Sequence, residues 1–391
     1  MMGAKSHWYL AIFLGSSTLT LASVYNSKLI SHATSSFLVH ATTSILLYFT
    51  SLTSLSFVAA EDWRLNARLK RAHGGGIEPF RFWAKEHAIF VTRATGLVAG
   101  AYLMALPLLV PTDDPIANLF LRIPTFFYAC KCWDLTVARA RKPPIPRSGK
   151  EDAIYGLTSW RPVASYVWRL ASETRYASFD IAVDESKRKS IPTSPARTYG
   201  PLLVVPLTYL FPIMELKVMC GLLAIQYGLE GFHSILHPRC PNALFFQPWT
   251  AESFTSFWAI HWHHGAQPFL QSLGYVPATA VFARLLGQDA GRAAGVLAAF
   301  SLSGIWHGWC AAVMAKDEYA WALSVGVWGV FMVQGVGCVV DRWLLRNESW
   351  RTGWRKRIVT ALSWLCSVES AAICLRYSEA RAKRPQGWTT W

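Results

Sequence analysis

Residues 291–314 read GRAAGVLAAFSLSGIWHGWCAAVM, an apolar stretch with Arg292 as its charged side chain. An apolar run of about 20 residues is long enough to cross a bilayer as an α-helix. The stretch holds Ser303, Gly304 and His307 in its second half. It therefore predicts a membrane-spanning helix that carries an imidazole among apolar side chains.

Further apolar runs along the chain predict further spans. These runs are Trp8–Val24, Phe37–Ala60, His87–Val110, Ile116–Val137, Ala320–Leu344 and Ile358–Leu375. The run Leu202–Leu236 contains Pro206 and Pro212, and we expect either one kinked helix or a short re-entrant piece followed by a span. The predicted fold is an all-α, multi-pass transmembrane helical bundle of about eight to ten helices with a central catalytic cavity.

The composition agrees with a membrane protein. Hydrophobic residues make up 52% of the chain and charged residues 16%, whereas soluble domains carry about 25% charged residues. The net charge is +15, and the basic residues lie between the apolar runs, as in cytosolic loops. The sequence has no nucleic-acid-binding motif, so we expect membrane lipids and an anionic substrate as partners and no nucleic acid.

The order of apolar and basic segments predicts one integral membrane domain over residues 1–391. It would consist of N-terminal helices (1–137), a cytosolic basic loop (138–200) and catalytic helices (201–391). Within the loop, aromatic and apolar residues recur from Ile154 to Leu170, which favours an amphipathic helix on the membrane surface.

His307 is the first candidate for chemistry, because ionisable side chains at membrane depth are costly and usually functional. A neutral imidazole in this position can accept the proton of an alcohol. A histidine that only hydrogen-bonds to a neighbouring helix explains the same residue equally well, and the residues alone leave both readings open.

The second candidate is the segment FTSFWAIHWHH, residues 254–264. On a helix, Trp258, His261 and Trp262 would share one face, and His263 would lie on another. One imidazole could then point into a cavity. An interfacial aromatic helix with histidines at headgroup level is the alternative.

Three stretches, Phe245–Trp249, Ser253–His263 and Ser303–His307, together resemble the wax-synthase-like branch of the membrane-bound O-acyltransferase family. Among its members they look closest to fungal terpenoid and meroterpenoid O-acetyltransferases. The resemblance implies that His307 is the catalytic base and that His263 is a second catalytic residue. Gln267 stands near the position where many members have an arginine.

The resemblance also implies the rest of the reaction. An acyl-CoA, most simply acetyl-CoA, would donate the acyl group to a lipophilic secondary-metabolite alcohol, with no cofactor and no metal. The tunnel for these substrates would be formed by Trp258, Trp262, Ser303 and Trp306. The family implies an endoplasmic reticulum location.

Three alternatives remain beside this reading. Fatty acyl transfer to a long-chain alcohol, as in a wax synthase, can use the same base. A membrane di-iron hydroxylase or desaturase would use His233 and His237 together with the histidines of residues 261–264, but about eight histidines in three boxes are required and a third box is missing. A non-enzymatic transporter would be expected to show an internal repeat, which the sequence lacks.

Overall fold

The computed structural model forms two compact units, Met1–Ala171 and Ser172–Trp391. It describes residues 32–71, 79–110, 114–147, 160–182, 213–236, 245–246, 248–262, 264–315, 317–344 and single residues or short pieces between 354 and 376. These residues form helices, turns and connecting segments and no β-strand, which confirms the predicted all-α class. The predicted domain boundaries at residues 137 and 200 stay predictions.

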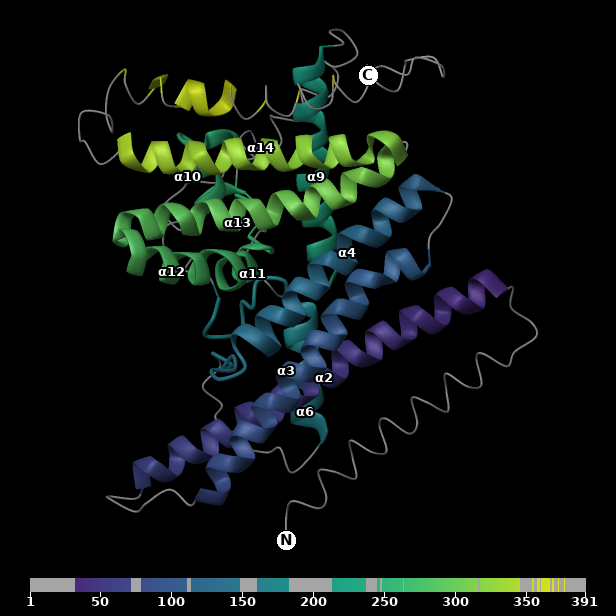
Figure 1. Ribbon diagram of the computed structural model, residues 1–391, viewed down its shortest axis with the longest axis vertical. Helices are drawn as coiled ribbons and strands as arrows, with labels where there is room; N and C mark the ends of the chain where they lie inside the picture. The colour runs from purple at the N-terminus through teal and green to yellow at the C-terminus, as the bar shows by residue number, and fades with distance from the viewer. Residues whose placement is uncertain are drawn as a thin grey trace. The chain divides into compact units, whose positions relative to one another are not determined.

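In the described part of the first unit, three long helices and a short one are present. They are α2 (His32–Arg71), α3 (Pro79–Leu109), α4 (Pro115–Trp133), which continues into the π-helix η1 (Asp134–Ala138), and α6 (Trp160–Ser172). Helix α3 packs against both α2 and α4 (Figure 1). Gly100 permits this close approach, since a Cβ there would lie 2.1 Å from the indole nitrogen of Trp133.

Helix α6 is anchored by buried polar groups. Lys131 is 1% exposed, and its Nζ donates a hydrogen bond of 2.9 Å to the carbonyl of Ala171 at the end of α6. The hydroxyl of Tyr166 donates to the carbonyl of Pro144 at 3.0 Å. The predicted amphipathic helix therefore exists, although residues 154–159 lie outside the described part. Its side chains Tyr166, Val167, Leu170 and Ala171 are buried in the protein, whereas Trp160 and Trp168 are exposed. Its place on the membrane surface stays a prediction.

The described residues of the second unit form ten elements. They are α9 (Met214–Leu236), η4 (Pro248–Thr250), α10 (Phe254–Ser256), η5 (Phe257–His261), α11 (Gln267–Phe269), η6 (Leu270–Tyr275), α12 (Val276–Leu286), α13 (Gln288–Ala311), η7 (Ala312–Met314) and α14 (Asp317–Leu344). Helices α12, α13 and α14 lie side by side in this order (Figure 1). Gly287, with φ +89°, makes the turn between α12 and α13, where a residue with a Cβ would be strained.

Five helical segments of the described residues are long and apolar enough to cross a membrane: Ser36–Ala60, Lys85–Leu109, Gln267–Leu286, Gln288–Met314 and Tyr319–Leu344. Four of them confirm the runs at Phe37–Ala60, His87–Val110, Gly291–Met314 and Ala320–Leu344. The run Trp8–Val24 and half of Ile358–Leu375 lie outside the described residues.

Three segments differ from the predictions. Gln267–Leu286 is an unexpected candidate span. Ile116–Val137 is helical, but it is not among the candidate spans, because Arg122, Lys131 and Asp134 lower its hydropathy. Leu202–Leu236 contributes α9, which begins at Met214 and thus follows both prolines, and α9 is not a candidate span either.

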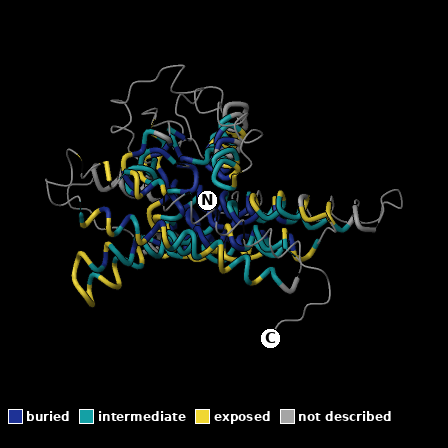
Figure 2. Tube along the Cα trace, turned by 90° about the horizontal axis from the view of Figure 1, so that it is seen from above, coloured by how far each residue is buried: buried dark blue, intermediate teal, exposed yellow. Residues whose placement is uncertain are grey.

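The surface of these helices is apolar. Trp343, Leu285 and Leu286 are each more than two-thirds exposed, and Figure 2 shows long exposed stretches along the helices of the chain. Exposed apolar area of this extent is unusual in a soluble monomer and is what a bilayer covers. The chain is therefore an integral membrane protein, as its sequence predicts.

Candidate active site

The imidazole of His307 lies on α13, and its orientation is fixed by its own helix. Nδ1 lies 2.8 Å from the carbonyl oxygen of Ser303, one turn earlier. A carbonyl only accepts hydrogen bonds, so Nδ1 carries the proton of the neutral ring and Nε2 carries the lone pair. His307 is exposed although its neighbours Trp306 and Gly308 are buried. The described residues offer Nε2 no hydrogen-bond partner, so a ligand can reach a preset proton acceptor.

Helix α14 packs closely on the same part of α13. A Cβ on Gly304 would lie 3.0 Å from the indole of Trp328, and one on Gly308 would lie 2.6 Å from the carbonyl oxygen of Ser324. The Ser324 hydroxyl donates to the carbonyl of Gly308 at 3.0 Å. This pair of glycines four residues apart is the small-residue pattern that brings membrane helices together. Gly304 and Gly308 thus admit a close neighbour, and that neighbour is helix α14.

Residues 254–264, the aromatic segment, begin directly after a helix cap at Ser253. The Ser253 hydroxyl accepts a hydrogen bond from the backbone N–H of Ser256, and the Ser256 hydroxyl accepts one from the backbone N–H of Ser253. This reciprocal pair is a capping box for α10. The helix then widens into the π-helix η5, in which the N–H of Trp262 donates to the carbonyl of Phe257 at 2.8 Å. The helical repeat expected for Trp258, His261 and Trp262 is therefore wrong. Trp262 ends η5 in an extended conformation, and its ring stacks on Phe257, five residues earlier, at 5.3 Å.

His261 has a structural role at the end of η5. It is 5% exposed, and its Nδ1 donates to the carbonyl of Phe246 at 2.5 Å, while the N–H of Phe246 donates to the carbonyl of His261 at 2.8 Å. The next histidine in the described part, His264, donates from Nε2 to the carbonyl of Ile260 at 2.9 Å. His263 lies outside the described residues, so its predicted catalytic role stays a prediction.

Trp258 connects the aromatic segment to helix α13, which carries His307, and to helix α14, which packs against α13. Its ring meets Phe300 of α13 edge-on at 5.2 Å and lies 6.0 Å from Phe331 of α14. Phe331 in turn lies 4.3 Å from the imidazole of His307. The structure thus brings Trp258 and His307 to one shared aromatic ring, although they are far apart in the sequence.

The other predicted substrate-binding residues have different surroundings. Trp306 is 7% exposed and packs against Phe269 at 6.0 Å, and Ser303 is 8% exposed. Trp262 lies between Phe257 and Phe245, the latter at 4.9 Å. Substrate contact by these residues stays a prediction. Ser303 and Trp306 contact the imidazole of His307 directly, through the Ser303 carbonyl and through the Trp306 ring at 5.2 Å. Trp258 reaches the imidazole through Phe331.

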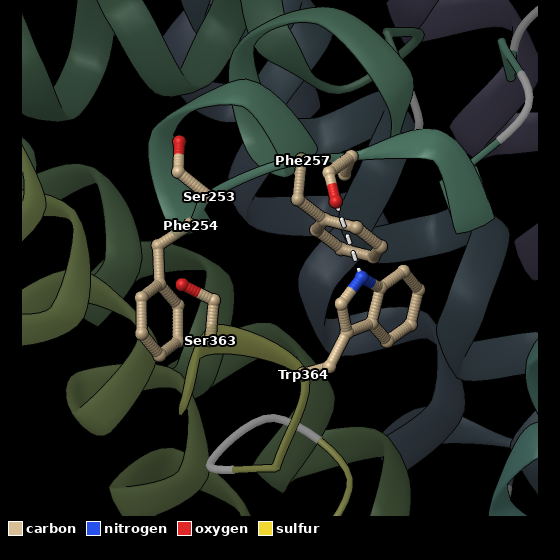
Figure 3. A pocket seen from close by; sticks show the side chains of 6 residues that line it. Ser253, Phe254, Phe257, Ser363 and Trp364 are labelled. Carbon is tan, nitrogen blue, oxygen red and sulfur yellow. Dashed lines mark hydrogen bonds between the residues drawn. The ribbon is translucent and has the colours of Figure 1, made fainter. Parts of the chain in front are cut away.

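A small hollow lies at the start of the aromatic segment (Figure 3). It is lined by Ala251, Ser253, Phe254, Phe257, Ser363 and Trp364. The indole of Trp364 donates to the carbonyl of Ala251 at 3.2 Å, and its ring meets Phe257 edge-on at 5.7 Å. None of the predicted site residues lines this hollow. Its role is structural, because Trp364 packs there against the start of the aromatic segment.

Phe331 and Gln334 are site residues that the sequence does not predict, because both lie in the apolar run of α14. The indole N–H of Trp258 donates to Oε1 of Gln334 at 3.3 Å. A glutamine within a predicted span is a usable signal, since polar side chains at this depth need partners.

The described residues contain no group of three or more His, Cys, Asp or Glu side chains that could hold a metal ion. The side chains of His233 and His237, which the di-iron alternative requires, lie outside the described residues, as does His263. The di-iron alternative therefore stays a hypothesis.

Residues 240–333 match the Membrane bound O-acyl transferase family. A curated relative from Arabidopsis thaliana, named probable long-chain-alcohol O-fatty-acyltransferase 1, is 30% identical over 81 residues, which are 21% of this chain and 24% of the relative. The chain thus spans about a quarter of the length of this relative. No solved structure matches the chain. The stretch that contains Trp258, Phe331 and His307 is therefore similar to membrane-bound O-acyltransferases.

Proposed function

We propose that this chain is a membrane O-acyltransferase that transfers an acyl group from a coenzyme A thioester to the hydroxyl of a lipophilic alcohol. One observation carries the proposal. Within a candidate span, His307 donates from Nδ1 to the Ser303 carbonyl, which leaves Nε2 as an accessible proton acceptor. The similarity of residues 240–333 to the Membrane bound O-acyl transferase family supports the reaction class.

His307 acts as the general base. Nε2 accepts the proton of the acceptor hydroxyl while the oxygen attacks the thioester carbonyl carbon. A C–O bond forms, the tetrahedral intermediate collapses, and the C–S bond breaks. The coenzyme A sulfur leaves with the bond electrons and takes the proton back from Nε2, which restores the neutral imidazole. Neither a covalent acyl-enzyme nor a cofactor is needed for this balance.

The surrounding residues place the substrates. Trp258 lies beside Phe331, whose ring also contacts His307, so an apolar group held against Trp258 would lie close to the base. We assign His263 to hydrogen bonding with the thioester or the base, following the family resemblance. Coenzyme A would enter from the basic, cytosolic side, and the alcohol would arrive through the bilayer, which we expect to be that of the endoplasmic reticulum.

Two substrate pairs follow from different observations. The motif resemblance favours acetyl-CoA with a terpenoid or meroterpenoid alcohol. The name of the Arabidopsis relative favours a fatty acyl-CoA with a long-chain alcohol as the second candidate. We propose the first pair, and the transfer assay described next distinguishes it from the second.

The test is transfer of radiolabelled acyl groups in microsomes that contain the expressed protein. Acetyl-CoA and palmitoyl-CoA are each combined with hydroxylated terpenoids and with long-chain alcohols. We expect His307→Gln to lower transfer at least about 100-fold, the lower range for losing a general base. His87→Ala is the matched control, because His87 is an exposed histidine that stacks on Trp83 in the other unit. Equal transfer by the wild type and His307→Gln would refute the proposal.

A further inference from the structure

Helix α14 carries two buried polar side chains, Gln334 and Asp341, in an otherwise apolar span. Phe331, Gln334, Cys338 and Asp341 recur at helical spacing and share one face. Gln334 is 3% exposed and Asp341 is 2% exposed, in a candidate span of mean hydropathy 1.9. Burying an amide and a carboxylate at this depth costs free energy, so each needs a role.

This row of residues lies against the aromatic segment, Phe331, Gln334 and Asp341 through their side chains and Cys338 through its carbonyl. Gln334 accepts from the indole N–H of Trp258 at 3.3 Å, and Asp341 accepts from the backbone N–H of Thr255 at 2.9 Å through Oδ2. The Thr255 hydroxyl donates to the carbonyl of Cys338 at 3.4 Å. Gly337 completes the contact, since a Cβ there would lie 2.8 Å from the ring of Phe254. The second half of α14 thus holds the short segment from Phe254 to Trp258.

The first half of α14 holds the helix that carries His307. Ser324 and Trp328 donate hydrogen bonds to the Gly308 carbonyl and the Ser301 hydroxyl, at 3.0 Å and 3.1 Å. Phe331 lies between the two halves and contacts the rings of both His307 and Trp258. One helix therefore fixes the distance between the base and the aromatic segment.

We propose that Gln334 and Asp341 are positioning residues that hold Trp258 and its segment in register with His307. The kinetic side of this proposal rests on the acyltransferase function proposed above. Asp341 acts as a hydrogen-bond acceptor and not as a charge partner, since no ion pair joins it to any described residue. An amide in its place keeps the acceptor, and an aliphatic side chain removes it.

The experiment compares Asp341→Leu with Asp341→Asn. Arg342→Leu is the matched control, because Arg342 is the next residue on α14 and is exposed. We expect kcat/KM to fall about tenfold in Asp341→Leu, to recover in Asp341→Asn and to stay unchanged in Arg342→Leu. The loss should lie mainly in KM, because the base keeps its own anchor at Ser303 while the substrate contacts shift.

A merely structural role predicts a different pattern. It would reduce the amount of folded enzyme, so the maximal rate would fall at unchanged KM, and that result would overturn the proposal. An equal loss in Asp341→Asn would overturn the acceptor role. A second test uses Gln334→Met, which should lower kcat/KM in the wild type but add little to Trp258→Phe, since both changes remove the same hydrogen bond.

A thiol-labelling measurement separates this proposal from the proposed function. Thr255→Cys places a thiol at the contact with α14, and its rate of reaction with a maleimide is read by peptide mapping. We expect Asp341→Leu, but not Arg342→Leu, to raise that rate, because the segment is then no longer held against α14. If the wild type transfers no acyl group while this pattern holds, the function fails and the positioning stands. If transfer occurs and Asp341→Leu leaves the labelling rate at position 255 unchanged, the positioning role is refuted.

Discussion

The closest contact between α13 and α14 gives the most direct prediction. A Cβ on Gly308 would lie 2.6 Å from the carbonyl oxygen of Ser324, about 0.8 Å inside the 3.4 Å at which ordinary contact begins. The obstacle is backbone, so it moves only if the helices separate. A separation of this size would also break the hydrogen bond from the Ser324 hydroxyl to the Gly308 carbonyl, which is 3.0 Å long.

We therefore expect Gly308→Ala to destabilise the protein by about 2 kcal/mol. Overpacking costs about 1–3 kcal/mol and the lost hydrogen bond about 1 kcal/mol, and the better helix propensity of alanine offsets about 0.5–1 kcal/mol. The matched control is Gly329→Ala on α14, where a Cβ would meet nothing within 4 Å. That change should be neutral or stabilising by up to about 1 kcal/mol.

The assay is thermal unfolding of the purified protein in one detergent, together with acyl transfer per amount of folded protein. Gly308→Ala should melt at a lower temperature than the wild type and transfer less, because His307 is the adjacent residue and its contact with Phe331 depends on the same helix spacing. If Gly308→Ala and Gly329→Ala melt together and transfer equally, the close packing of α13 on α14 is refuted.

Three further changes test other parts of the structure. Ser253→Ala removes the cap of α10 and should cost about 1 kcal/mol of stability in thermal unfolding, whereas Ser253→Asp should keep most of it. Lys131→Met leaves the Ala171 carbonyl without its buried donor and should speed proteolysis near α6, which an unchanged cleavage rate would contradict. Tyr102→Phe removes the hydroxyl that lies 2.6 Å from Nδ1 of His40 and should lower the melting temperature by a few degrees without changing acyl transfer.

The spans that could be predicted from the sequence are those that length and hydropathy are sufficient to identify. Residues 291–314 and 320–344 are long runs of mostly apolar residues, and within a bilayer such a run satisfies its backbone hydrogen bonds by forming a helix. Gln267–Leu286 escaped because Gln267, Gln271 and two prolines dilute its hydropathy, and because its first part is the π-helix Leu270–Tyr275. No sequence pattern predicts a π-helix, since its hydrogen bonds depend on the tertiary contacts that stabilise it.

The site shows the same division. His307 could be found from the sequence, because a histidine inside an apolar run is rare and costly. The face on which Trp262 lies could not, because it depends on the change from an α-helical to a π-helical repeat at Phe257. Gln334 and Phe331 were missed because their importance comes from contacts to Trp258, and those contacts join residues that are 76 and 73 positions apart.

A base contributes to catalysis only when the reacting hydroxyl is held within hydrogen-bond reach of it. The tautomer of His307 is set within one turn of its own helix, so it survives any movement of α13 as a rigid body. The position of Trp258 relative to that base is set by a different helix, through Phe331, Gln334 and Asp341. The family match ends at residue 333, so two of these three residues lie beyond the matched stretch. The chemistry is therefore encoded locally, whereas the alignment of base and substrate depends on α14. Substitutions on its inner face should change substrate binding before they remove the base.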